Sequence, residues 1–197
     1  RNINHCVLRL EKLLPSHYET NATGDVAEDH KLLLRDKENA GQVLERVGIE
    51  FSKLQFFSKK VQDHPIIEQL KPRIEDITSE LQAQLDAYFK SSVKSNDRKA
   101  VRQALRTYLS IDMVHAAEST YTCQFVRPRL IKIFNEENLQ NNDLEKLYRS
   151  AIEFLDKDFF QLKQHISHHG KGYEPLDEFD FLVNSFLVET LRILVNH

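Results

Sequence analysis

The sequence predicts an all-α protein, an elongated helical bundle or rod that begins with a short coiled-coil-like stem. Apolar residues recur three or four positions apart along most of the chain, which is the spacing of one helix face. The 197 residues include only five Gly and five Pro, and no stretch alternates β-branched and polar residues between glycine turns. Hydrophobic residues make up 41% of the chain, which is enough to form a core.

The first expected helix runs from about Ile3 to Leu14 and carries an apolar stripe. Its members lie 4, 3 and 4 positions apart: Ile3, Val7, Leu10 and Leu14. This spacing is typical of a coiled-coil seam, although it covers less than two heptads. Pro15 is expected to end the helix, and residues 16–24 are polar and aperiodic, as linkers are. We therefore assign residues 1–40 to the end of a stem and a linker.

Residues 41–197 are assigned to a helical-rod domain made of successive amphipathic helices. The apolar periodicity is strongest at residues 43–61, 67–88, 97–115, 125–134, 143–166 and 177–195. Asp97 is expected to cap the third of these helices. Pro128 is expected to kink its helix, and Pro72 either to kink its own or to delay the start to near Lys71. No repeat of fixed period is evident, which argues against a regular solenoid.

The charge and composition argue against several classes of protein. The net charge of -3, from 27 Lys and Arg against 30 Asp and Glu, is unlike the basic balance of a dedicated nucleic-acid binder. No run approaches the ~18 consecutive apolar residues of a membrane span. Two cysteines, Cys6 and Cys123, cannot build a disulfide scaffold, so a reducing compartment is expected.

Motifs for nucleotide binding or hydrolysis are absent: the sequence contains no GxGxxG, GxxxxGK[ST], HExxH, CxxC or GxSxG. His165 and His169 lie four residues apart, a spacing that two metal ligands on one helix can use. No third ligand is evident, and histidines just before Gly170 also suit the negative end of a helix. We predict no catalytic residue, cofactor, metal or small-molecule substrate. A helical metalloenzyme using His165 and His169 is an alternative.

Charge is distributed unevenly along the chain. Residues 90–132 hold nine Lys and Arg against three Asp and Glu, a local charge of +6, whereas residues 133–197 carry six against twelve, a charge of -6. Four basic residues recur every fourth position and share one face if a single helix covers them: Lys94, Arg98, Arg102 and Arg106. This face is a candidate contact for an acidic partner or for anionic lipid headgroups. The alternative, which we favour, is a solvated face or one that pairs with the acidic C-terminal helices of the same chain.

Several blocks of sequence, taken in order, resemble one family. They are residues 41–57 (GQVLERVGIEFSKLQFF), 70–81 (LKPRIEDITSEL), 105–118 (LRTYLSIDMVHAAE), 126–128 (VRP) and 179–185 (FDFLVNS). Together they are similar to subunit 2 of the conserved oligomeric Golgi complex. The resemblance is strong over residues 41–134 and 179–195, and weaker over residues 1–40 and 135–178. None of these blocks is a catalytic fingerprint.

The resemblance implies a non-enzymatic subunit of a vesicle-tethering complex that docks on the cytoplasmic face of the Golgi as a peripheral membrane protein. Such subunits are helical rods with N-terminal coiled coils that join one subunit to another, and they act in intra-Golgi retrograde transport and Golgi organisation. The implied partners are the other subunits of the complex, Golgi SNAREs and small GTPases, with no nucleic acid. The stripe of Ile3, Val7, Leu10 and Leu14 would then bind partner helices. The family's sequence usually continues past this point, so a truncation at His197 is expected.

Overall fold

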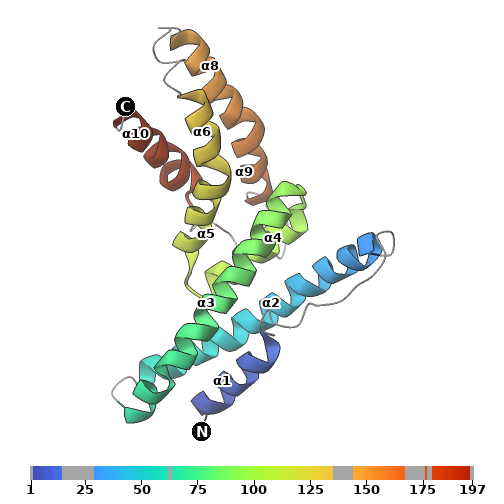
Figure 1. Ribbon diagram of the computed structural model, residues 1–197, viewed down its shortest axis with the longest axis vertical. Coiled ribbons are helices and arrows are strands. Elements are labelled where there is room, and N and C mark those ends of the chain that lie inside the picture. Colours follow the sequence, from blue (N-terminus) through green and yellow to red (C-terminus); the bar gives the residue numbers. More distant parts are fainter. Residues whose placement is uncertain are drawn as a thin grey trace.

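The fold is built from helices that form an elongated, two-part assembly (Figure 1). The computed structural model describes residues 2–14, 29–61, 64–134, 144–166, 176 and 179–195. Within these ranges no strand occurs, and the predicted all-α class is confirmed. The first part contains α1 (Asn2–Leu13), α2 (Asp29–Lys60), α3 (Pro65–Lys94) and α4 (Arg98–Ser110). The second contains α5 (Val114–Tyr121), α6 (Arg127–Ile133), α8 (Leu144–Phe154), α9 (Phe160–Ile166) and α10 (Val188–Val195).

The first part is a bundle in which α1 and α4 pack against the two long helices α2 and α3. Its centre is fully or almost fully buried and takes side chains from all four helices: Val7, Leu10, Val47, Leu54, Leu81, Leu85, Leu105 and Tyr108. These residues follow the three-and-four spacing read from the sequence. The predicted apolar faces are therefore the faces that the bundle buries.

Helix α2 is longer than its apolar periodicity predicted. It runs without a break from Asp29 to Lys60, so the boundary that we set between residues 40 and 41 falls inside a helix. The sequence from Asp29 to Ala40 is rich in Leu, Lys, Arg, Glu and Ala, which have high helix propensity. Propensity therefore extends the helix where the apolar pattern is weak. The division into two domains remains a prediction.

Helix α3 extends beyond the apolar periodicity of residues 67–88 at both ends. It starts at Pro65, where proline is well tolerated, and the backbone N–H of Ile66 donates to His64 Nδ1 at 3.2 Å. The alternative of a late start near Lys71 is wrong, because Pro72 lies inside the helix. The helix continues to Lys94, and Asn96 then adopts a left-handed conformation with φ of 54°. Asparagine tolerates this conformation, which is a common way to end a helix.

The predicted helix over residues 97–115 is two helices in the structure. Asp97 caps α4 as expected, since its Oδ1 accepts from the Ala100 N–H at 3.1 Å. Helix α4 then ends at Ser110, and Asp112 has a φ of 59° before α5 begins. The turn contains neither Gly nor Pro, so the sequence carried no strong sign of it. Ile111, which the predicted helix placed on its apolar face, is fully buried at this turn.

Pro128 is accommodated by a change of helix type. The segment η1 (Thr122–Val126) between α5 and α6 is π-helical, and the Arg127 N–H donates to the Thr122 carbonyl. Proline has no N–H to donate to the carbonyl four residues earlier. At this position, hydrogen bonds between residues five apart therefore replace the α-helical hydrogen bonds between residues four apart. Two further π-helical segments follow, η2 (Leu155–Phe159) and η3 (Leu182–Leu187).

A buried polar node joins α3, α4 and α5. The Tyr108 hydroxyl donates to Asp86 Oδ1, which also accepts from Thr120 Oγ1 at 3.0 Å. Burial, followed by the hydrogen bond to Asp86, raises the pKa of Tyr108 far above its usual range. Tyr108 therefore stays a neutral donor, and the node fixes the register of three helices.

Helices α2 and α4 approach each other closely at Gly48. A Cβ at this position would lie 2.9 Å from Thr107 Cγ2 and 3.2 Å from Ser110 Oγ. The neighbouring polar contacts depend on this approach: Ser52 Oγ donates to the Ser110 carbonyl, and Gln55 Nε2 donates to the Ile111 carbonyl at 3.1 Å. A side chain at residue 48 must therefore push the two helices apart.

We expect Gly48→Leu to lower the free energy of unfolding by about 1–3 kcal/mol, although leucine is the better helix former. Urea denaturation followed by circular dichroism measures the change. Ile49→Leu is the matched control, because Ile49 is the next residue and is exposed, and its effect should stay within about 0.5 kcal/mol. Equal stability of the two variants would contradict the close approach of α2 and α4.

Candidate interaction surfaces

The predicted stem stripe lies inside the chain's own core. Its four residues, Ile3, Val7, Leu10 and Leu14, are between 0 and 9% exposed, and they lie on or directly after α1, which packs on α2 and α3. The structure of the single chain therefore gives the stripe an intramolecular role. Its role toward a partner helix stays a prediction, and it requires α1 to leave this site.

Ion pairs flank the stripe and hold α1 in place. Arg73 on α3 makes a bidentate contact with Glu11, with nitrogen-to-oxygen distances of 2.9 and 2.7 Å. Arg9 Nη1 lies 3.3 Å from Glu50 Oε1 on α2. A hydrogen bond from Lys53, more than the charge of Arg9, lowers the pKa of Glu50. The contacts to α2 and α3 lie on either side of the apolar stripe and fix the docking of α1.

The four predicted basic residues do not form one exposed face, because no single helix carries them. Lys94 ends α3, and the turn through Asn96 separates it from Arg98, Arg102 and Arg106 on α4. Arg102 is only 8% exposed, and Arg98 Nη2 donates to the Gln164 carbonyl of α9 at 3.0 Å. Two of the four side chains, those of Arg98 and Arg102, therefore pack against other parts of the same chain. Membrane or partner contact through these residues stays a prediction.

The histidine pair falls at the edge of what the structure describes: His169 and the side chain of His165 lie outside the described residues. Among the described side chains, no group of three or more His, Cys, Asp and Glu could hold a metal ion. Nor is any described helix both long enough and apolar enough to cross a bilayer.

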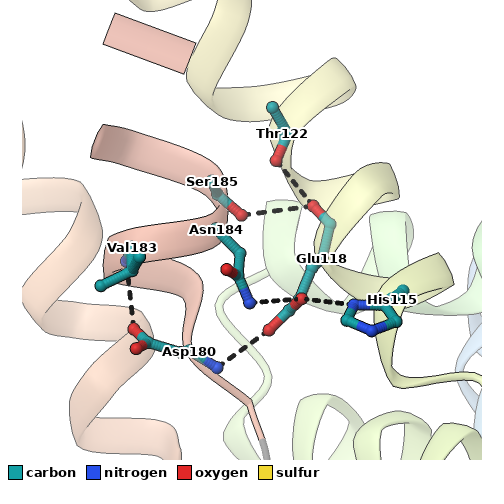
Figure 2. Close-up of polar contacts among 7 residues, drawn as sticks. All are labelled: His115, Glu118, Thr122, Asp180, Val183, Asn184 and Ser185. Carbon is teal, nitrogen blue, oxygen red and sulfur yellow. Dashed lines mark hydrogen bonds and ion pairs between the residues drawn. The ribbon is translucent and has the colours of Figure 1, made fainter. Parts of the chain in front are cut away.

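A buried carboxylate that the sequence analysis missed joins α5 to the C-terminal segment. Glu118 is almost fully buried, and Figure 2 shows its side chain at the centre of a polar cluster. Its Oε1 accepts the backbone N–H of Asp180 at 2.9 Å, and its Oε2 accepts Asn184 Nδ2 at 2.9 Å and lies 3.3 Å from His115 Nδ1. The Ser185 hydroxyl donates to the Glu118 carbonyl at 3.3 Å. A single glutamate on an amphipathic helix gives no sequence signal of this role.

Aromatic rings strengthen the same junction. Phe181 lies against the Tyr121 ring at a centroid distance of 5.2 Å and stacks on Phe179 at 5.6 Å. It also stacks on Phe89 of α3 at 6.5 Å. The C-terminal segment is therefore anchored to α3 and α5 by both apolar and polar contacts.

An ion pair fixes α10 beside α6. Arg127 Nε lies 2.5 Å from Glu189 Oε1, and Arg127 Nη2 lies 3.3 Å from Oε2. This hydrogen bonding raises the pKa of Arg127. Arg127 belongs to the basic stretch 90–132 and Glu189 to the acidic stretch 133–197, so these oppositely charged stretches meet here within one chain.

The outer side of η3 and α10 is apolar and exposed. Val183, Leu187, Leu191 and Leu194 lie 4, 4 and 3 positions apart and are 42 to 62% exposed. We call these four residues the C-terminal apolar face. Leu182, Val188 and Val195 are exposed beside it, while Phe181, Phe186 and Ile193 of the same segment are buried. A helix that is apolar on most sides is the sequence signal that we overlooked, and exposed apolar patches mark contact sites.

These observations define a class: an elongated, all-α protein with exposed apolar side chains on its described surface. No family model matches the sequence, and no solved structure matches it.

Curated relatives give a more specific result. The chain is 30% identical over 196 residues to conserved oligomeric Golgi complex subunit 2 of Homo sapiens, and 29% identical over 207 residues to the subunit of the same name from Arabidopsis thaliana. The matches cover 91% and 95% of this chain but 25% and 27% of the relatives, so the chain spans about a quarter of their length. The resemblance to subunit 2 of this complex, drawn above from short blocks of sequence, is confirmed.

Proposed function

We propose that this chain is part of a non-enzymatic subunit of a Golgi vesicle-tethering complex and acts in intra-Golgi retrograde transport and Golgi organisation through protein contacts. The observation that carries the proposal is the similarity along 91% of the chain to a protein named as a subunit of the conserved oligomeric Golgi complex. The other subunits of that complex are the first proposed partners, and Golgi SNAREs and small GTPases are further ones. The proposed location is the cytoplasmic face of the Golgi membrane.

The C-terminal apolar face supports assembly as the mechanism. Its four side chains repeat at the spacing by which helices pack against each other, and removal of such side chains from water stabilises an interface by roughly 1.5–3 kcal/mol each before ordering costs. The junction built around Glu118 holds this face in a fixed orientation (Figure 2). We therefore propose the C-terminal apolar face as a contact with another subunit.

The test is recovery of the complex from cells. We expect the tagged full-length parent protein to co-purify with the other subunits in comparable amounts by quantitative mass spectrometry. Leu187→Asp/Leu191→Asp should reduce that recovery about tenfold or more, because two charged groups would enter an apolar contact. Ile49→Asp/Phe56→Asp, which places the same two charges at exposed apolar positions on α2, is the matched control.

Two results would contradict the proposal at different levels. Recovery of no other subunit with an intact and folded bait would contradict the assignment to the complex. Normal recovery with Leu187→Asp/Leu191→Asp would leave the assignment standing and remove the C-terminal apolar face as the contact.

A further inference from the structure

A cavity of about 360 Å³ opens where the two parts of the fold meet. The end of α3, the η1–α6 segment and the α8 and α9 helices contribute its lining. This volume lies within the range of ligand pockets, about 300–1,000 Å³. The cavity is on a different surface from the C-terminal apolar face, because none of the four residues of that face lines it.

The inner wall of the cavity is apolar. Tyr121, Phe154 and Leu162 line it and are buried, while Val93 and Phe125 line it and are half-buried. All five side chains are aromatic or branched, and they come from five helical segments: α3, α5, η1, α8 and α9. Such a wall accepts an apolar side chain from outside and offers little to a purely polar ligand.

The rim of the cavity is cationic. Lys94, Arg129 and Lys132 are exposed and line it, and among the residues whose side chains the structure describes no Asp or Glu lines it. A ligand that approaches the rim therefore meets positive charge.

Two of the π-helical segments adjoin this cavity. The segment η1 supplies Gln124 and Phe125 to its lining, and η2 begins directly after Phe154. Single π-helical turns are frequent at functional sites, where they change the direction of side chains. The cavity thus coincides with the two places where the long helices α5–α6 and α8–α9 depart from α-helical geometry.

We propose that this cavity binds an acidic segment of a partner protein, with one or two apolar side chains inside and carboxylates at the rim. Charge complementarity favours an acidic ligand, and the apolar inner wall favours a peptide over a bare anion or a lipid headgroup. This proposal goes beyond the assembly role, since it concerns a second surface and a partner of defined chemistry. It makes no use of the C-terminal apolar face.

The first experiment is a fluorescence anisotropy titration of the 197-residue chain with a labelled synthetic peptide in which glutamates flank two leucines and a phenylalanine. Two control peptides have Lys in place of Glu, or Ser in place of the apolar residues. We expect only the acidic apolar peptide to bind, with an affinity that falls as salt is raised. Equal binding of a control peptide, or no binding of the test peptide, would overturn the proposal.

Variants then locate the binding. Lys94→Glu/Lys132→Glu should raise the Kd about tenfold or more, and Gln124→Trp, which enlarges a rim residue without a change of charge, should also weaken binding. Lys71→Glu is the matched control, because Lys71 is exposed on α3 and does not line the cavity. Circular dichroism confirms that each variant is folded. A Kd that all variants leave unchanged would overturn the assignment to this cavity.

A vesicle-binding experiment distinguishes a peptide ligand from a membrane surface. Phosphatidylcholine vesicles with and without phosphatidylserine are tested by flotation with the same variants. The proposal would be overturned in favour of a lipid if the peptide did not bind, the chain bound anionic vesicles, and Lys94→Glu/Lys132→Glu abolished the vesicle binding. Recovery of the complex from cells is measured separately, so a failure of peptide binding leaves the assembly function untouched.

Discussion

Replacement of Leu10 by aspartate should lower the free energy of unfolding by about 4 kcal/mol or more. Leu10 lies in the centre of the stripe on α1 and is fully buried against the chain's own helices. Truncation of a buried leucine alone costs about 2–5 kcal/mol, and a carboxylate in its place adds the cost of an unpaired buried charge. If the stripe bound only partner helices, Leu10→Asp would weaken subunit assembly and leave the rod folded. The burial of Leu10 instead predicts an effect on folding.

Urea denaturation of Leu10→Asp and Leu8→Asp distinguishes these outcomes. Leu8 lies on the same helix but is 52% exposed, so its replacement should change the free energy of unfolding by no more than about 0.5 kcal/mol. If both variants were as stable as the parent chain, α1 would not pack as described. Loss of partner subunits from a Leu10→Asp bait of unchanged stability would restore the stripe as a partner contact.

Glu118→Ala should have the second largest effect and should act mainly on the C-terminal segment. The substitution removes the acceptor of the Asp180 N–H and of Asn184 Nδ2 at a buried position. Each donor left without a partner costs about 1–3 kcal/mol. Because both hydrogen bonds are only partly buried, we expect a total loss in the lower part of the summed range, about 2–4 kcal/mol. Because these contacts join α5 to the segment that carries η3 and α10, their loss should release that segment before the rest of the chain unfolds.

Hydrogen exchange with mass spectrometry measures this release directly. Amides of residues 181–195 should exchange faster in Glu118→Ala, while those of α2 and α3 keep their protection. Glu145→Ala is the matched control, since Glu145 is an exposed glutamate on α8 that pairs with Arg149 four residues away, a contact worth about 0.3–0.5 kcal/mol. If residues 181–195 exchanged at the same rate in the parent chain and in Glu118→Ala, the cluster in Figure 2 would not hold the C-terminal segment in place.

The fold class and the buried helix faces were predictable because apolar periodicity and burial have the same physical origin. Helix ends were less predictable, since they depend on local chemistry that periodicity does not record. The residues from Asp29 to Ala40 extend α2 through helix propensity, and Asp112 breaks a predicted helix with a left-handed backbone in a turn without glycine. Pro72 remains inside α3 because the packing of a long helix outweighs one missing hydrogen bond.

The candidate surfaces were less predictable because they depend on the arrangement of helices. The spacing of Lys94, Arg98 and Arg102 indicated one basic face, but the turn at Asn96 divides it. The stripe of α1 was predicted to bind partner helices. In this chain it packs on α2 and α3, and the partner contact stays a prediction. The role of Glu118 becomes apparent only when the side chains of neighbouring helices are placed, whereas the C-terminal apolar face has a sequence signal in a helix that is apolar on most sides.

The junction at Glu118 has a consequence for the order in which the chain acquires its structure during translation. Helices α1 to α4 are consecutive and bury their shared centre among themselves, so they have all their mutual contacts once about the first half of the chain has left the ribosome. The Asp180 N–H that Glu118 accepts is 62 residues further on, and Phe89 and Tyr121 lack the ring of Phe181 until that residue is made. Docking of the C-terminal segment onto α3 and α5 is therefore a long-range step, with a larger entropic cost of loop closure. Until the segment docks, the nascent protein exposes an aromatic surface for chaperones to bind.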